Sequence, residues 1–160
     1  MSAKHLVFVC TGNSCRSVMA EGLMRQMLQR AGIDTVTIES AGIFAVGGMQ
    51  PTRETLRVLQ EIGIDASAHR ARMLLSGAVE AADLIFVMEQ FQLEEVVRRF
   101  PSAKDRVHLL KLYGLSSPVA EVQPNISDPI GKPLEVYEVC FSDIREAVDR
   151  VARSLGVHTV

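Results

Sequence analysis

The sequence feature that most constrains the fold lies near the N-terminus, where an apolar run leads into a short polar loop and then into a helix. Leu6–Val9 is a continuous apolar segment rich in β-branched and aromatic residues, typical of a strand buried on both faces of a parallel sheet. Gly12 and Asn13 tolerate unusual backbone angles and indicate a tight loop. Met19–Arg30 carries apolar residues along one helical face and predicts a helix. This order of elements is typical of an α/β fold.

The residues of this loop point to an anion-binding site. Cys10 ends the apolar run, and Arg16 follows it with five residues between them. Backbone N–H groups and the helix dipole favour negative charge at a helix start, and an arginine grips two phosphate oxygens at once. A thiol at the base of this loop would ionise readily and could attack a bound phosphorus. Taken in isolation, a buried cysteine is more often an inert structural thiol.

Several separate segments resemble one known family. They are the Cys-x5-Arg-Ser loop at Cys10–Ser17, Ser40–Gly42, His69–Arg72, Ala82–Met88 and Asp128-Pro129. Together they resemble the low-molecular-weight protein-tyrosine-phosphatase family over nearly the whole chain. By itself, Ser-Asp-Pro is common turn chemistry.

The resemblance implies a role for three residues. It makes Cys10 the nucleophile that forms a cysteinyl-phosphate intermediate, and Arg16 the residue that binds phosphate. It makes Asp128 the general acid for the leaving group and then the general base for water. No metal and no organic cofactor are expected, because the loop, Arg16 and the helix start supply the positive field.

The resemblance also implies supporting residues around the loop. Ser40 and His69 match positions that hold the loop in shape through hydrogen bonds with Asn13 and Ser17, although His69 alone would also suit an exposed helix edge. Cys15 matches a second cysteine that can form a protective disulfide with Cys10. The residues expected to line the phosphate are Thr11, Gly12, Asn13, Ser14, Cys15 and Ser17.

The phosphorylated substrate residue is suggested by two departures from the commonest family pattern. Ser14 stands where tyrosine-specific members usually carry isoleucine, and Ile130-Gly131 replaces the aromatic pair that usually follows Asp-Pro. A hydroxyl in the loop resembles the arginine phosphatases of this family, which carry threonine there, although those tend to have phenylalanine after Asp-Pro. Phe44 is a candidate wall of the pocket. We therefore favour phosphoarginine, with phosphotyrosine as the alternative.

Two other classes share the fold or the loop. Arsenate reductases use two further cysteines near the third strand, but Ala81–Phe100 contains no cysteine. A non-catalytic oxyanion-binding protein would be expected to have lost Cys10 or Asp128, and both are present.

The rest of the chain alternates predicted strands and helices. Further strands are predicted at Thr35–Glu39, Asp83–Met88 and Val107–Leu110, and further helices at Pro51–Gly63, Met73–Ala81, Gln90–Phe100 and Leu134–Leu155. The last helix is expected to bury Val136, Val139, Cys140, Ile144, Val148 and Val151. Tyr113–Pro133 reads as a long loop, and loops of that length are usually functional. The pattern predicts a three-layer α/β fold: an open four-stranded parallel sheet with helices on both faces and its ligand at the carboxyl ends of the strands.

Size and composition exclude several classes of protein. The 160 residues fit a single domain spanning 1–160, and 48% hydrophobic residues argue against disorder. A net charge of −2 indicates no basic face for nucleic acid, and no apolar run reaches membrane-spanning length. The three cysteines and the lack of an apparent signal peptide favour reduced thiols in the cytoplasm. We expect a monomer whose partner is a phosphorylated protein substrate.

Overall fold

The computed structural model describes residues 4–116 and 121–158, and within these ranges a sheet of four parallel strands forms the centre of the molecule. The strands are β1 (Lys4–Cys10), β2 (Val36–Gly42), β3 (Leu84–Val87) and β4 (Val107–Leu109). Their order across the sheet is β2-β1-β3-β4, with Val7 beside Glu39 on one side and beside Ile85 on the other. The predicted open parallel α/β sheet is confirmed.

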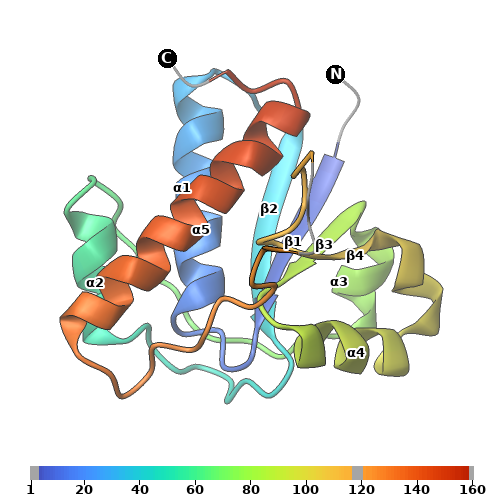
Figure 1. The fold of residues 1–160 in the computed structure, drawn as a ribbon, viewed down its shortest axis with the longest axis horizontal. Helices are drawn as coiled ribbons and strands as arrows, with labels where there is room; N and C mark the ends of the chain where they lie inside the picture. Colours follow the sequence, from blue (N-terminus) through green and yellow to red (C-terminus); the bar gives the residue numbers. More distant parts are fainter. Residues whose placement is uncertain (1–3, 117–120, 159–160) are drawn as a thin grey trace.

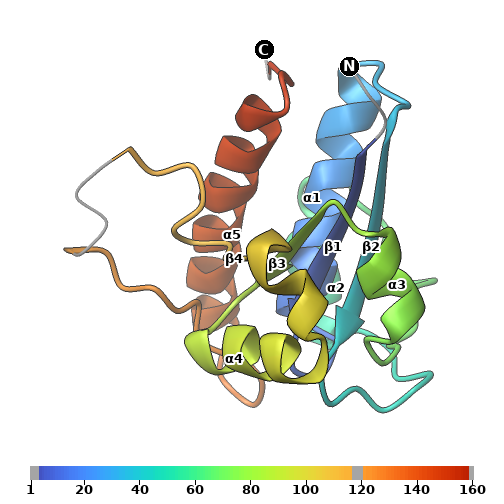
Figure 2. The same cartoon turned by 90° about the vertical axis from the view of Figure 1, so that its right-hand side faces the viewer.

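Helices cover both faces of the sheet, as predicted. They are α1 (Arg16–Arg30), α2 (Arg53–Gln60), α3 (Ser76–Ala81), α4 (Gln90–Arg99) and α5 (Leu134–Ser154), with a 3₁₀ turn at Pro101–Arg106. Figure 1 shows α1 and α5 on one side of the sheet and α3 and α4 on the other, and Figure 2 shows α5 and α3 on opposite sides. Alternate residues of β1 serve the two cores: Leu6 and Phe8 pack with α1 and α5, while Val7 and Val9 pack with α3 and α4.

The carboxyl ends of the strands gather the segments that the sequence marked as functional. The N-termini of α1 and α4 and the chain leading into α5 all lie at this edge of the sheet (Figure 1). Residues 117–120 of the predicted long loop lie outside the described residues. None of the helices in the described part of the chain is long and apolar enough to cross a membrane.

Some element boundaries differ from the prediction. α1 begins at Arg16 rather than at Met19, and β2 continues through Ser40 to Gly42 because those residues still pair with β1. The predicted helix at Met73–Ala81 is shorter and begins at Ser76, because Met73 instead forms a parallel bridge with Gly42. This bridge brings the segment around Met73 to the same edge of the sheet as the loop.

The buried face of α5 differs from the predicted one. Val136 and Val139 are 41% and 63% exposed, whereas Tyr137 and Phe141 are 1% and 9% exposed. The predicted set was wrong at the two valines because the helix turns its aromatic side chains toward α1 and α2, where they bury more apolar surface. Cys140, Ile144, Val148 and Val151 are buried as predicted.

The orientation of α5 can be tested with a matched pair of truncations. Ile144 is 0% exposed, so Ile144→Ala is expected to lower the free energy of unfolding by about 2–5 kcal/mol. Val139→Ala, on the exposed face, should change it by less than about 0.5 kcal/mol. Urea denaturation of both variants measures these values, and similar losses in the two would contradict this orientation.

Candidate active site

Cys10 is the last residue of β1 and its thiol lies at the base of the loop that follows. The residue is 2% exposed. The sulfur lies 3.0 Å from the hydroxyl of Ser17 and accepts a hydrogen bond of 3.3 Å from the backbone N–H of Asn13.

Asn13 holds the loop in an uncommon conformation. Its φ of 54° lies in the left-handed region, which residues other than glycine rarely adopt. Its side-chain amide donates to Ser17 and Ser40, its side-chain oxygen accepts from the backbone N–H of Arg72, and its carbonyl is bound by the His69 ring. The residues predicted to support the loop therefore meet at Asn13, and neighbouring segments hold it there.

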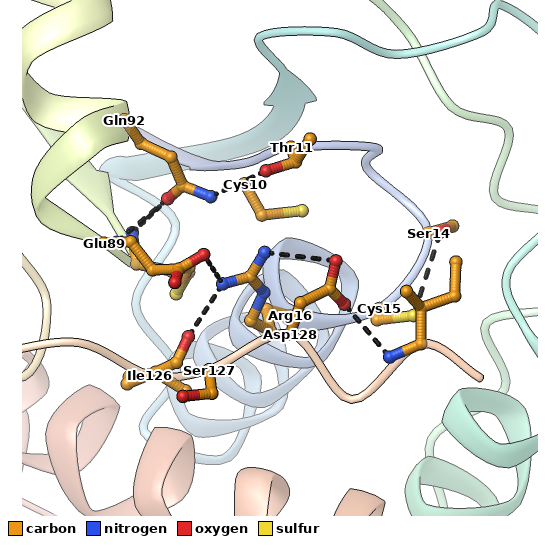
Figure 3. Close-up of polar contacts among 12 residues, drawn as sticks. Cys10, Thr11, Ser14, Cys15, Arg16, Glu89, Gln92, Ile126, Ser127 and Asp128 are labelled. Atoms are coloured by element: carbon orange, nitrogen blue, oxygen red, sulfur yellow. Dashed lines mark hydrogen bonds and ion pairs between the residues drawn. The ribbon is translucent and has the colours of Figure 1, made fainter. Parts of the chain in front are cut away.

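Arg16, the first residue of α1, points its guanidinium beneath the cysteine (Figure 3). The side chain is 1% exposed, and Nη1 donates to Glu89 at 2.6 Å and to the carbonyl of Ile126 at 2.7 Å. Nη2 lies 3.6 Å from a carboxylate oxygen of Asp128. Nε is buried and finds no hydrogen-bond partner among the described residues. Arg16 therefore keeps donor capacity for an anion in the loop.

The ionisation of Arg16 follows from these neighbours. Burial lowers the pKa of Arg16, but the charges of Cys10, Glu89 and Asp128 raise it by more, so its pKa lies above the ordinary value. The guanidinium is thus a permanent positive charge at the floor of the site.

Asp128 approaches from the other side of Arg16 on the segment before α5 (Figure 3). Its side chain is 39% exposed and accepts a hydrogen bond from the backbone N–H of Ile130. Ile126 is fixed to the end of β3 by a 2.8 Å bond from its N–H to the carbonyl of Met88, and Asn125 binds the N–H of Gln90 at the start of α4. The structure therefore brings Cys10, Arg16 and Asp128 together.

The other predicted loop residues surround this centre. The hydroxyl of Thr11 accepts a hydrogen bond from Gln92, and Ser14 is 9% exposed with its hydroxyl 3.8 Å from the sulfur of Cys15. Gly12 lies between Thr11 and Asn13 at the turn of the loop. The thiol of Cys15 lies 3.5 Å from the hydroxyl of Thr52.

The side chains of Asn13 and Ser17 bond to Cys10, to Ser40 and to each other. Of these two residues, only the backbone N–H groups are therefore placed to contact phosphate. Both residues are 0% exposed. The first N–H groups of α1 have no partner within the helix, which begins at Arg16 and leaves them free to bind an anion.

The three cysteines are free thiols with different surroundings. Burial raises the pKa of the Cys140 thiol to about 12, so this thiol stays protonated at neutral pH. Its sulfur lies 3.9 Å from the carbonyl of Ser127, in the core behind the segment that carries Asp128. Cys140 is therefore a core residue, as predicted.

Two residues that contact the candidate site were not predicted from the sequence. Glu89 binds Arg16, and the side-chain oxygen of Gln92 accepts the N–H groups of Met88 and Glu89 while its nitrogen binds Thr11. Glu89 and Gln92 form a capping box at the start of α4. An acidic residue directly after a buried strand, with glutamine three positions later, is the sequence signal that could have identified them.

The arrangement suits a tetrahedral oxyanion rather than a metal. Figure 3 shows the thiol of Cys10 above Arg16, with Glu89 and Asp128 on opposite sides of the guanidinium. Within residues 4–116 and 121–158, no group of three or more His, Cys, Asp or Glu side chains is arranged to hold a metal ion. A nucleophilic sulfur, a buried guanidinium, a helix start and a carboxylate at the rim are the parts needed for phosphoryl transfer through cysteine.

Comparison with known proteins gives the same class. Residues 5–159 match the family described as low molecular weight phosphotyrosine protein phosphatase. The chain is 36% identical to a protein-arginine-phosphatase from Geobacillus stearothermophilus, over 94% of this chain and 95% of the relative. It is also 36% identical to the probable low molecular weight protein-tyrosine-phosphatase EpsP from Ralstonia nicotianae, over 91% and 92% of the two chains.

A solved structure adds a chemical detail. The YwlE arginine phosphatase, as a cysteine-to-serine mutant with a phosphorylated active-site serine, is 30% identical and superposes with a TM-score of 0.87 over 95% of each chain. The present chain belongs to the low-molecular-weight protein-tyrosine-phosphatase family. It is a protein phosphatase, and hence a hydrolase, as the resemblance implied.

Gly42 offers a test of how closely β2 must approach the loop. A Cβ added there would lie 2.6 Å from the carbonyl oxygen of Thr11 and 3.0 Å from the backbone nitrogen of Asn13. Gly42→Ala should therefore displace the loop and lower kcat/KM for phosphate-ester hydrolysis by about tenfold to a hundredfold. Gly77→Ala is the control, because no atom lies within 4 Å of its added Cβ. An unchanged kcat/KM in Gly42→Ala would contradict the close packing.

Proposed function

We propose that the chain hydrolyses a phosphorylated protein side chain through a cysteinyl-phosphate intermediate on Cys10, with phosphoarginine as the favoured substrate. The observation that carries this proposal is the orphan Nε of Arg16, a buried donor beside a nucleophilic sulfur. A bound phosphoryl group would satisfy that donor and place its phosphorus against the thiolate. The phosphorylated serine of the YwlE mutant supports covalent transfer in a relative.

In the first step, the thiolate of Cys10 attacks phosphorus. The S–P bond forms while the P–N bond of phosphoarginine, or the P–O bond of a phosphate ester, breaks. Asp128 gives its proton to the departing atom, so that an ester oxygen leaves as a neutral hydroxyl and the nitrogen of phosphoarginine leaves as part of the arginine guanidinium. Arg16 and the first N–H groups of α1 stabilise the charge on the phosphoryl oxygens.

In the second step, water hydrolyses the intermediate. The Asp128 carboxylate takes a proton from the attacking water as the new P–O bond forms. The S–P bond breaks, inorganic phosphate leaves and the thiolate of Cys10 is restored. The hydroxyl of Ser14, at the edge of the same loop, can orient this water.

The walls of the site favour phosphoarginine over phosphotyrosine. Ser14 places a small hydroxyl at the loop, and Ile130, which is 55% exposed, stands where an aromatic side chain would flank a phenyl ring. The protein-arginine-phosphatases among the relatives support the same substrate.

Phe44 supplies an aromatic surface beside the loop. Its backbone N–H binds the carbonyl of Thr11 at 2.9 Å, and its ring is 56% exposed. Arg99 lies 4.8 Å from the ring centroid and binds the carbonyl of Ile43, which fixes this segment to α4. A planar guanidinium can stack on the face of such a ring.

Phosphotyrosine is the alternative substrate. The same exposed face of Phe44 would accept a phenyl ring, and the EpsP relative is described as a probable protein-tyrosine-phosphatase. The two substrates require the same chemistry at Cys10, so the choice between them depends on the residues that surround the substrate side chain: Ser14, Phe44 and Ile130.

The domain organisation, oligomeric state and location of the enzyme are part of the proposal. We propose a single phosphatase domain spanning 1–160, acting as a monomer in the cytoplasm, where free thiols persist. We further propose that a peroxide, which is reduced to water or an alcohol, oxidises the two thiols to a Cys10–Cys15 disulfide that shields the nucleophile from irreversible oxidation. Support comes from the position of both thiols in the same short loop.

The role of Asp128 can be tested with leaving groups of different basicity. Asp128→Ala should lower kcat/KM, which reports the first step alone, about 10²–10⁴-fold for phenyl phosphate, whose leaving group needs a proton. The loss should be much smaller for p-nitrophenyl phosphate, which leaves as a stable anion. Asp143→Ala is a matched control, since Asp143 is 41% exposed and pairs with Lys111, and Cys10→Ser gives the background. Equal losses on both substrates would remove Asp128 as general acid.

The substrate residue can be tested by competing peptides. Wild-type protein should show a higher kcat/KM for a phosphoarginine peptide than for a phosphotyrosine peptide of the same sequence. Ser14→Ile should shift this ratio toward phosphotyrosine by about tenfold or more, because it removes the hydroxyl and narrows the loop. Ser142→Ile, which changes an exposed serine of α5, should leave the ratio unchanged. A wild-type preference for phosphotyrosine would support the alternative.

A further inference from the structure

A chain of hydrogen bonds runs from the protein surface to the sulfur of Cys10. The hydroxyl of Ser40 bonds to a carboxylate oxygen of Glu21 at 3.0 Å. The Asn13 amide nitrogen lies 3.0 Å from the Ser40 hydroxyl and 2.8 Å from that of Ser17, which is 3.0 Å from the sulfur. Glu21 lies on α1 and stands outside every role assigned above.

The donor and the acceptor of each hydrogen bond in this chain follow from two groups, the Glu21 carboxylate and the Asn13 amide nitrogen. An ionised carboxylate only accepts, so the hydrogen of Ser40 points to Glu21, and the oxygen of Ser40 is left to accept from Asn13. The Asn13 amide nitrogen only donates, so Ser17 accepts from it and directs its own hydrogen to Cys10. The chain therefore delivers one donated hydrogen to the sulfur.

The orientation of the Asn13 amide is the critical step. If the amide turned over, its oxygen would face the two serines, and Ser17 could donate to that oxygen instead of to the sulfur. Two contacts oppose this rotation: the N–H of Arg72 donates to the amide oxygen at 3.0 Å, and Glu21 takes the hydrogen of Ser40.

We propose that Glu21 is a positioning residue that fixes the direction of this hydrogen-bond chain, so that Ser17 donates to the Cys10 thiolate. The proposal rests on the proposed nucleophilic role of Cys10 and adds a residue on the opposite side of the loop from the substrate. Glu21 acts through Ser40, Asn13 and Ser17 and touches neither phosphate nor sulfur.

Other charged groups surround both ends of the chain. Arg25 lies 3.7 Å from the second carboxylate oxygen of Glu21, whose side chain is 15% exposed. Glu21, Asp65 and His69 line one surface hollow of about 370 Å³. The side chain of Arg72 donates to the carbonyl of Ser40.

At the other end, the thiolate of Cys10 faces Arg16, with Glu89 and Asp128 bound to that guanidinium. These groups set the overall charge at each end of the chain. The hydrogen-bond chain adds one specific contact to these charges, the hydrogen bond from the Ser17 hydroxyl to the Cys10 sulfur.

The proposal predicts an effect opposite to that of charge alone. Removing the negative charge of Glu21 would, by simple Coulomb attraction and repulsion, make ionisation of Cys10 easier. Removing the acceptor for Ser40 releases the chain, weakens the donation from Ser17 and makes ionisation harder. The sign of the change therefore separates the two effects.

The experiment measures the rate at which iodoacetamide alkylates Cys10 as a function of pH, with the modified peptide quantified by mass spectrometry. Glu21→Met removes both acceptor and charge, and Glu21→Gln removes the charge but keeps an amide oxygen that can accept. We expect the half-maximal pH to rise by roughly half a unit or more in Glu21→Met, about a threefold lower thiolate fraction below that pH, and by less in Glu21→Gln.

Glu39→Met is the matched control. Glu39 precedes Ser40 on β2 and its side chain is 21% exposed; it binds His5 and lies 3.9 Å from the guanidinium of Arg72, but it makes no hydrogen bond to Ser40, Asn13 or Ser17. Its removal should not raise the half-maximal pH.

Each other outcome overturns the proposal. An equal fall in the half-maximal pH in both Glu21 variants would mean that only its charge acts on Cys10. An unchanged profile, with or without lower thermal stability, would mean that Glu21 is merely structural. Alkylation of the unmutated protein tests the role of Cys10 separately from that of Glu21. If the protein with alkylated Cys10 keeps its phosphatase activity, Cys10 is not the nucleophile, whatever the Glu21 variants show.

Discussion

Burial of the Arg16 guanidinium is the interaction on which the site depends. A charge that is 1% exposed is costly unless its partners replace water, and here they come from three separate parts of the chain. Glu89 comes from the start of α4, Ile126 and Asp128 from the segment before α5, and Cys10 from β1. The need to compensate one charge therefore fixes the positions of the proposed acid and nucleophile relative to each other.

The loop between β1 and α1 has two working faces. Its front presents the sulfur, Arg16 and the helix start to an anion, while its back is held through Asn13. A residue at φ 54° persists only where its surroundings hold it there, and the contacts from Ser40, His69 and Arg72 provide that support. Gly42 belongs to the same support because only a residue without Cβ fits against Thr11.

Much of this architecture could be predicted from the sequence, because short-range patterns determine it. The strand before Cys10, the helix after Arg16 and the alternation of later elements indicated an open parallel sheet. The pattern could not decide which stripe of α5 is buried, since Val139 and Tyr137 both fit an apolar face and only packing against α1 and α2 chooses between them. Glu21 reads as an ordinary surface acid until the fold places it beside Ser40, and the capping signal at Glu89 indicates a helix start but not its contact with Arg16.

Substrate choice depends partly on residues that lie outside the catalytic loop. The proposed nucleophile Cys10 and the phosphate-binding Arg16 lie at the β1–α1 loop and are constrained by buried contacts, while the proposed acid, Asp128, comes from the segment before α5. Of the groups proposed to choose the substrate, Ser14 is buried in that loop, whereas Phe44 and Ile130 are exposed and lie on connecting segments. A change in exposed residues costs little stability, whereas a change behind Asn13 disturbs the loop itself. Phe44 and Ile130 can therefore change without disturbing the centre; two relatives at the same 36% identity are described as a protein-arginine-phosphatase and as a probable protein-tyrosine-phosphatase.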